Sequence, residues 1–163
     1  MNKNKFIRIL GLAFALIFGI SVVDMVFFVP LHLQIGEVLA FPSVPSSLAI
    51  GLFWTLAVLI GLGVSATYYI CLKDKSETIG ILFTYLFGAI AGWEDIFYYI
   101  SKGQSVLGMQ LPDLKANVFI NTISNGLGAS VPTGGTLVAS ALAGLGIILV
   151  VDYVLLKIDW GRK

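Results

Sequence analysis

Long uncharged apolar stretches separated by short polar segments dominate the hydrophobic pattern of the chain. No charged residue lies between Arg8 and Asp24, or between Glu37 and Lys73. About 20 apolar residues in a helix cross the ~30 Å hydrocarbon core of a bilayer. The pattern therefore predicts transmembrane helices over about residues 6–29, 47–72, 79–101 and 136–156.

The composition supports the same class of protein. Of the 163 residues, 58% are hydrophobic and 12% are charged, whereas a soluble domain averages about a quarter charged residues. We expect one all-α integral membrane domain over residues 1–163. The net charge of +1 offers no basic field for nucleic acid, and the single cysteine, Cys71, excludes an internal disulfide and a cysteine metal cluster.

Basic residues indicate how the helices are oriented. Lysine and arginine are enriched in the cytoplasmic segments of membrane proteins. With both termini in the cytoplasm, only Lys102 and Lys115 lie outside. The other basic residues then lie inside: Lys3, Lys5, Arg8, Lys73, Lys75, Lys157, Arg162 and Lys163. The sequence thus predicts a multi-pass cell-membrane protein with both termini cytoplasmic.

Small residues recur every fourth position on each predicted helix. Transmembrane helices associate where such residues let their backbones approach. The stripes are Gly11/Ala15/Gly19, Ala57/Gly61/Ser65, Gly80/Thr84/Gly88/Gly92 and Thr136/Ser140/Gly144. They predict a compact four-helix bundle embedded in membrane lipid, and a stripe left over could form a homo-oligomer or bind a membrane-complex partner.

The predicted loops differ in length. Residues 73–78 form a short inner connection in which Asp74 or Ser76 could cap the third helix. The outer connection over residues 102–135 is long. Within it, residues 114–124 suit a short helix that lies on the membrane surface or folds onto the bundle.

An acidic pair, Glu94 and Asp95, lies near the end of the third apolar segment, beside Trp93, Tyr98 and Tyr99. Carboxylates are costly in a membrane unless they have partners, so the pair is a candidate functional site. The tyrosine hydroxyls one turn away could donate hydrogen bonds to the carboxylates. The alternative is structural, with the carboxylates reaching the interface inside an aromatic belt.

The stripe through Gly88 and Gly92 leads to Asp95, so we expect Asp95 to face the bundle and Glu94 to lie on its flank. On the first helix, Asp24 should reach nearly the same depth as the pair. A different acidic residue, Asp152, lies about one turn from the inner end of the last helix, where Lys157 and Tyr153 could anchor it, and is assigned a structural role.

Carboxylates and one imidazole suit a divalent metal ion, although no metal-spaced motif is present. The metal hypothesis uses five residues: Glu94, Asp95, Asp24, His32 and Glu37. The other hypothesis is acid–base chemistry without a metal, in which one carboxyl keeps a proton and its neighbour is ionised.

Three functions fit this pattern. The first is a small intramembrane enzyme that acts on a lipid, isoprenoid or other apolar substrate through Glu94, Asp95, Asp24, Tyr98 and Tyr99. The second is a non-catalytic four-helix subunit of a larger membrane complex. The third is an oligomeric cation channel or transporter, which the absence of a repeat and of helices broken by glycine or proline at mid-membrane disfavours.

Overall fold

The computed structural model describes residues 3–28 and 46–158, and in that part every regular element is a helix. One isolated bridge joins Gln110 to Thr133. The elements are α1 (Lys3–Val23), η1 (Asp24–Phe28, a π-helical segment), α3 (Ser46–Leu72), α4 (Lys75–Ile90), α5 (Trp93–Ser101), η2 (Pro112–Ala116, a 3₁₀ helix), α6 (Val118–Gly126) and α7 (Gly134–Lys157).

Three helical segments are long and apolar enough to cross a membrane. They lie in α1 with the start of η1, in α3 and in α7. A fourth is present if α4 and α5, which meet at a bend of 68°, count as one span. The limits of the apolar helices therefore agree with the predicted segments, except that the third is broken, and the predicted number of four is reached only when the bent pair is counted as one span.

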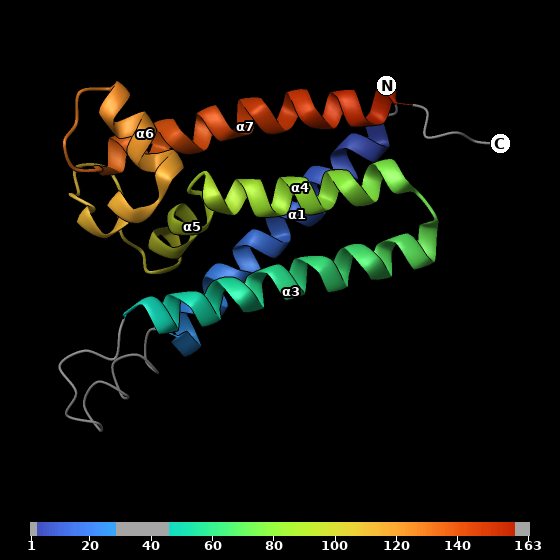
Figure 1. Ribbon diagram of the computed structural model, residues 1–163, viewed down its shortest axis with the longest axis horizontal. Helices are drawn as coiled ribbons and strands as arrows, with labels where there is room; N and C mark the ends of the chain where they lie inside the picture. The colour runs from blue at the N-terminus through green and yellow to red at the C-terminus, as the bar shows by residue number, and fades with distance from the viewer. Residues whose placement is uncertain (1–2, 29–45, 159–163) are drawn as a thin grey trace.

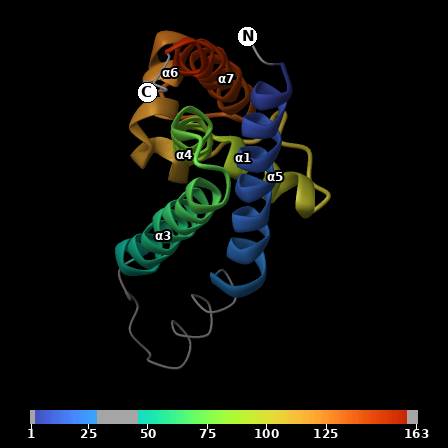
Figure 2. The ribbon, with the colours of Figure 1, turned by 90° about the vertical axis from the view of Figure 1, so that its right-hand side faces the viewer.

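Helix α4 lies at the centre of the bundle, with α1, α3 and α7 packed around it (Figures 1 and 2). Glycines make the close approach of α1 possible. A Cβ at Gly80 would lie 2.8 Å from Ile9 Cδ1, and one at Gly88 would lie 2.7 Å from Ile17 Cδ1. The predicted stripe on α4 is thus a packing surface.

The stripes on α3 and α7 are also buried as predicted. A Cβ at Gly61 would lie 2.6 Å from the ring of Tyr85, whose hydroxyl donates to Ala57 O at 2.9 Å. On α7, a Cβ at Gly144 would lie 2.3 Å from Ala91 Cβ. Three helices therefore pack through the small residues that the sequence singles out.

The stripe on α1 does not pack, which corrects the prediction for that helix. Gly11 and Gly19 have no neighbouring atom within 4 Å of a built Cβ, and Ala15 between them is exposed. The buried face of α1 is made of branched and small apolar residues: Ile9, Ala13, Ile17 and Ile20. These larger side chains fit against the glycines of α4, so the small residues of α1 face outward.

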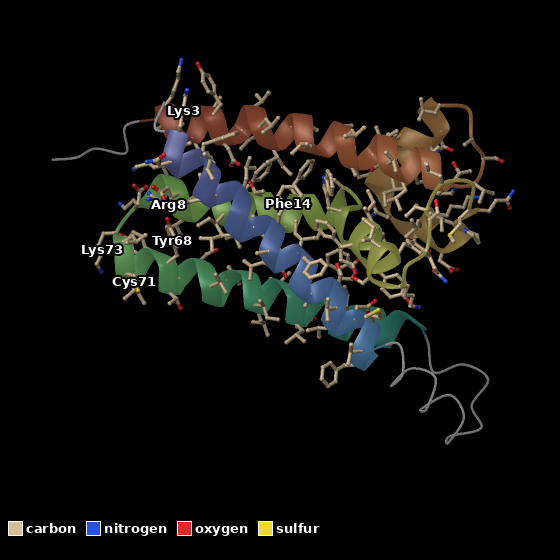
Figure 3. The ribbon with its side chains drawn as sticks, turned by 180° about the vertical axis from the view of Figure 1, so that it is seen from behind. Lys3, Arg8, Phe14, Tyr68, Cys71 and Lys73 are labelled. Atoms are coloured by element: carbon tan, nitrogen blue, oxygen red, sulfur yellow. The ribbon has the colours of Figure 1, made fainter. Side chains whose placement is uncertain are left out.

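One end of the bundle, here called the basic end, is where α1 begins, α3 ends, α4 begins and α7 ends (Figure 1). Figure 3 shows Arg8 and Tyr68 near each other there. The Arg8 guanidinium binds Glu77 at two points, with Nη2–Oε1 at 2.7 Å and Nε–Oε2 at 3.2 Å. Lys5 pairs with Asp74, and Asp74 Oδ1 accepts from Glu77 N at 3.0 Å, which confirms Asp74 as the cap of α4.

The opposite end, here called the loop end, holds α5, η2 and α6 (Figure 1). The connection after α5 folds onto the bundle: Leu111 N donates to Pro132 O at 2.8 Å and Gly134 N to Met109 O at 2.9 Å. A small apolar core, separate from the main core between α1, α3 and α4, lies beneath this connection. It is formed by Val106, Leu111, Ile120 and Leu137. The predicted loop helix exists, and it packs on α7.

Candidate functional site

The acidic pair follows a break between α4 and α5. Gly92, the residue before α5, has φ +105°, and a Cβ there would lie 2.4 Å from Leu137 Cδ1. Both the left-handed backbone and the close contact favour glycine at this position. The prediction of one continuous helix over residues 79–101 is therefore wrong, because the chain turns by 68° at this glycine.

Side chains from α1, from α7 and from Asn117, the residue that caps α6, satisfy carbonyl groups around the break. Asn117 Nδ2 donates to Ile90 O at 2.9 Å, and Ser140 Oγ donates to Ala91 O at 2.9 Å. On the far side of the break, Ser21 Oγ donates to Glu94 O at 3.0 Å. Irregular backbone is stable in an apolar setting only where such partners exist, so these bonds fix the position of the acidic pair.

Glu94 is the more deeply buried member of the pair, at 7% exposure, whereas Asp95 is partly exposed. The expectation that Glu94 lies on the flank is therefore wrong, and both residues of the pair lie within the bundle. The stripe through Gly88 stops at the break, and α5 restarts in a new direction, so the register of α4 does not carry over. Both carboxylates lie in the first turn of α5, where the helix dipole favours negative charge.

Asp24 joins the pair from another helix, as the sequence predicts. It begins the π-helical segment η1 at the end of α1, and π-helical turns are frequent at functional sites. Its carboxylate lies near enough to Glu94 and to Asp95 to repel both electrostatically. The three residues are referred to below as the acidic cluster.

The acidic cluster lacks close partners within the described ranges 3–28 and 46–158. No donor there makes a hydrogen bond to its side-chain oxygens, and no lysine or arginine nitrogen lies within 4.0 Å of them. Lys102 attracts Asp24 at longer range. The cluster therefore carries negative charge that the described side chains do not neutralise.

The two tyrosines do not donate to the cluster. Lys102 Nζ binds the Tyr98 hydroxyl and lies 4.3 Å from the centre of its ring. The ring of Tyr99 packs edge-on against Tyr98, with centroids 5.5 Å apart, and Asp95 acts on Tyr99 only electrostatically. Their predicted role as hydrogen-bond donors to Glu94 and Asp95 is absent from the described structure.

The metal hypothesis receives no support from the described residues. No group of three or more histidine, cysteine, aspartate and glutamate side chains there is arranged to hold a metal ion, and this includes Asp24, Glu94 and Asp95. His32 and Glu37, the other predicted ligands, lie outside the described residues.

Comparisons with known proteins do not identify a family. No protein-family model matches the chain, and no curated protein or solved structure is significantly similar to it. The functional argument therefore depends on the geometry of the chain itself.

Sequence reasoning missed the ion network at the basic end. Glu77 is 1% exposed and binds Arg8, and Tyr68 donates to it as well. The signal was available: Arg8 and Glu77 each border an apolar stretch on the side predicted to be cytoplasmic. Opposite charges at one level of neighbouring helices are natural partners.

Asp152 also differs from its predicted surroundings. We expected Tyr153 and Lys157 to anchor it at the inner end of the last helix. Instead, Lys157 lies 4.5 Å from the ring centre of Tyr153 at the surface, and Asp152 is fully buried. Thr84 Oγ1 on α4 donates to Asp152 Oδ2 at 2.8 Å. The carboxyl faces the bundle because it lies on the same buried stripe of α7 as Ile148.

Proposed function

We propose that the chain is an integral membrane protein in which α1, α3, the bent pair α4–α5 and α7 cross the bilayer. The supporting observation is that long helices carry large apolar side chains on their outer surfaces, such as Leu59 at 60% and Val150 at 64% exposure. Lipid contact accounts for such surfaces. The basic end would face the cytoplasm, in keeping with the enrichment of lysine and arginine there.

We further propose that the acidic cluster is the acid–base site of an intramembrane enzyme that acts on a lipid, isoprenoid or other apolar substrate. The observation that carries this proposal is Glu94, a residue at 7% exposure whose carboxyl has no donor among the described residues and has two other carboxylates as electrostatic neighbours. Such a group is the expected chemistry of a general acid or base.

The charge balance explains the proposed chemistry. Three neighbouring carboxylates, offset among the described residues only by Lys102 at longer range, repel one another strongly in an environment of low dielectric constant. At least one of them would keep a proton, and an ionised neighbour would accept one. That division between a proton donor and a proton acceptor is how paired carboxylates act in catalysis.

The test compares membrane lipids from cells that produce the wild type, Glu94→Gln or Asp113→Asn. Asp113 is an exposed residue of η2 and serves as the matched control. Mass spectrometry of the extracted lipids should reveal a species that changes with the wild type and with Asp113→Asn, but not with Glu94→Gln. A lipid profile that Glu94→Gln alters as much as the wild type does would contradict the proposal.

A second candidate, a subunit of a larger membrane assembly, is favoured by the outward stripe Gly11, Ala15 and Gly19 on α1. Small residues on an exposed helix face allow another helix to approach. Light scattering of the protein in detergent should then give the mass of a complex, and Gly11→Leu should reduce it to that of one chain. A monomeric wild type that purifies without other proteins would count against this candidate.

A further inference from the structure

A second buried carboxyl, Asp152, lies apart from the acidic cluster. It is 0% exposed on α7, and its Oδ2 accepts a hydrogen bond from the hydroxyl of Thr84 at 2.8 Å. Among residues 3–28 and 46–158, Oδ1 has no hydrogen-bond partner. Asp152 lies five residues before Lys157, the last residue of α7, or ~7.5 Å along the helix at 1.5 Å per residue.

The surroundings of Oδ1 are apolar. A Cβ built on Gly80 of α4 would lie 3.2 Å from Oδ1 and 2.8 Å from Ile9 Cδ1 of α1. The carboxyl is therefore enclosed where α1, α4 and α7 approach one another. A bare carboxylate in such a place would lose most of the solvation that water gives it.

Charged groups on the same helices do not compensate Asp152. The described ones are Lys3, Lys5 and Arg8 on α1, Lys75 and Glu77 on α4, and Lys157 on α7. Arg8 and Lys5 are engaged with Glu77 and Asp74, and Lys157 lies over the ring of Tyr153. No lysine or arginine nitrogen of the described residues comes within 4.0 Å of Asp152.

We propose that Asp152 is a proton-binding site, and that the folded protein holds it as a neutral carboxylic acid. Oδ2 is then the carbonyl oxygen that accepts from Thr84, and Oδ1 carries the proton. The neutral acid needs no counter-ion, which matches the single hydrogen bond and the apolar contacts. This inference is independent of the function proposed for the acidic cluster.

The proton on Asp152 should also stabilise the packing of α7 against α4. Losing it would leave an uncompensated charge between α4 and α7, since no lysine or arginine nitrogen of residues 3–28 and 46–158 lies within 4.0 Å to balance it. Water can reach the carboxyl only if the helices separate locally. Proton release should therefore be coupled to a loosening of α7 from α4, and alkaline conditions should promote both.

The test is infrared spectroscopy of the full chain in detergent, with aspartate labelled by ¹³C. The wild type should give the carbonyl band of a protonated aspartic acid at neutral pH. The band should remain in an Asp24→Asn/Asp95→Asn variant and disappear when Asp152→Asn is added to that variant. An identical band in the triple variant, or a wild type with no protonated aspartate, would overturn the proposal.

Thr84 provides a second measurement that does not require a change of Asp152. Thr84→Val removes the donor to Oδ2 and should shift the carbonyl band to higher frequency, whereas Thr84→Ser should restore the wild-type position. A band that stays in place in Thr84→Val would contradict the assignment. Because the glutamates are unlabelled, neither result depends on whether Glu94 is catalytic.

Discussion

The two ends of the bundle differ in the groups that surround a buried glutamate. At the basic end, Glu77 is 1% exposed and is bound by Arg8 and Tyr68. At the loop end, Glu94 is 7% exposed, and the carboxylates of Asp24 and Asp95 are its electrostatic neighbours. The same residue type is thus fully partnered at one end and surrounded by like charge at the other.

Under the proposed function, this difference separates a structural role from a chemical one. The network around Glu77 joins α1, α3 and α4 through hydrogen bonds and ion pairs, so it holds the bundle together. The carboxylates of the acidic cluster repel one another, and among the described residues only Lys102 offsets this repulsion, at longer range. Perturbed carboxyl groups of this kind are concentrated at functional sites, which is why the proposal assigns the chemistry to this end.

The largest effect on stability is expected from Glu77→Leu. It removes the buried acceptor of the Tyr68 hydroxyl and of the half-exposed Arg8 guanidinium, and the lost charge-assisted hydrogen bonds should lower the free energy of unfolding by about 3 kcal/mol. Chemical denaturation in detergent measures this loss, and Lys75→Ala, an exposed neighbour on α4, should leave stability unchanged. Equal stability of Glu77→Leu and wild type would show that the network is not structural.

The second largest effect is expected at the break. Gly92→Ala forces a side chain into left-handed backbone and against Leu137, and should cost about 2 kcal/mol. Gly146→Ala on α7, where no atom lies within 4 Å, should instead gain about 0.5 kcal/mol. The same denaturation measurement checks both. A neutral Gly92→Ala would mean that α4 and α5 join without the observed turn.

A smaller loss is expected from Tyr68→Phe. The hydroxyl donates to a buried, ionised carboxylate, and its removal should cost about 1.5 kcal/mol. Tyr69→Phe is the matched control, because Tyr69 is adjacent on α3 and contacts Lys73 through its ring. A difference between the two variants isolates the contribution of the Glu77 hydrogen bond.

The smallest effect is expected from Asp24→Asn at the loop end. This change removes one of three repelling charges, so the protein should be unchanged or more stable by less than about 1 kcal/mol. Thermal unfolding followed by circular dichroism measures the shift. A clear destabilisation would mean that Asp24 has a favourable contact, and the contrast between the two ends would weaken.

Much of the fold follows from apolar length and small residues. The limits of α3 and α7, the cap at Asp74 and the buried stripe Gly80–Gly88 were all predictable, because each depends on local chemistry or on a simple period. The approach of Asp24 to the acidic pair was predictable too. Helices α1 and α4 both begin at the basic end, and Asp24 and the pair lie nearly the same number of residues from it.

The remaining features depend on tertiary contacts that the sequence does not display. The break at Gly92 is stabilised by donors from Asn117, which caps α6, and from Ser140 on α7, and neither is near it in sequence. Because the helix breaks there, the helical period of α4 does not predict which face of α5 carries Glu94. The small residues of α1 were wrongly predicted to form its packing face. The glycines of α4 already make room for the larger side chains of α1, so the small residues of α1 are not needed for close packing.

The contrast between Glu77 and Glu94 is tested most directly by one matched measurement. The free energy of unfolding would be compared for Glu77→Gln and Glu94→Gln, two substitutions of equal size, in the same detergent. We predict that Glu77→Gln loses about 2 kcal/mol, because charge-assisted hydrogen bonds are weakened, and that Glu94→Gln loses none. A loss in Glu94→Gln as large as that in Glu77→Gln would show that the acidic cluster is structural and would contradict the account.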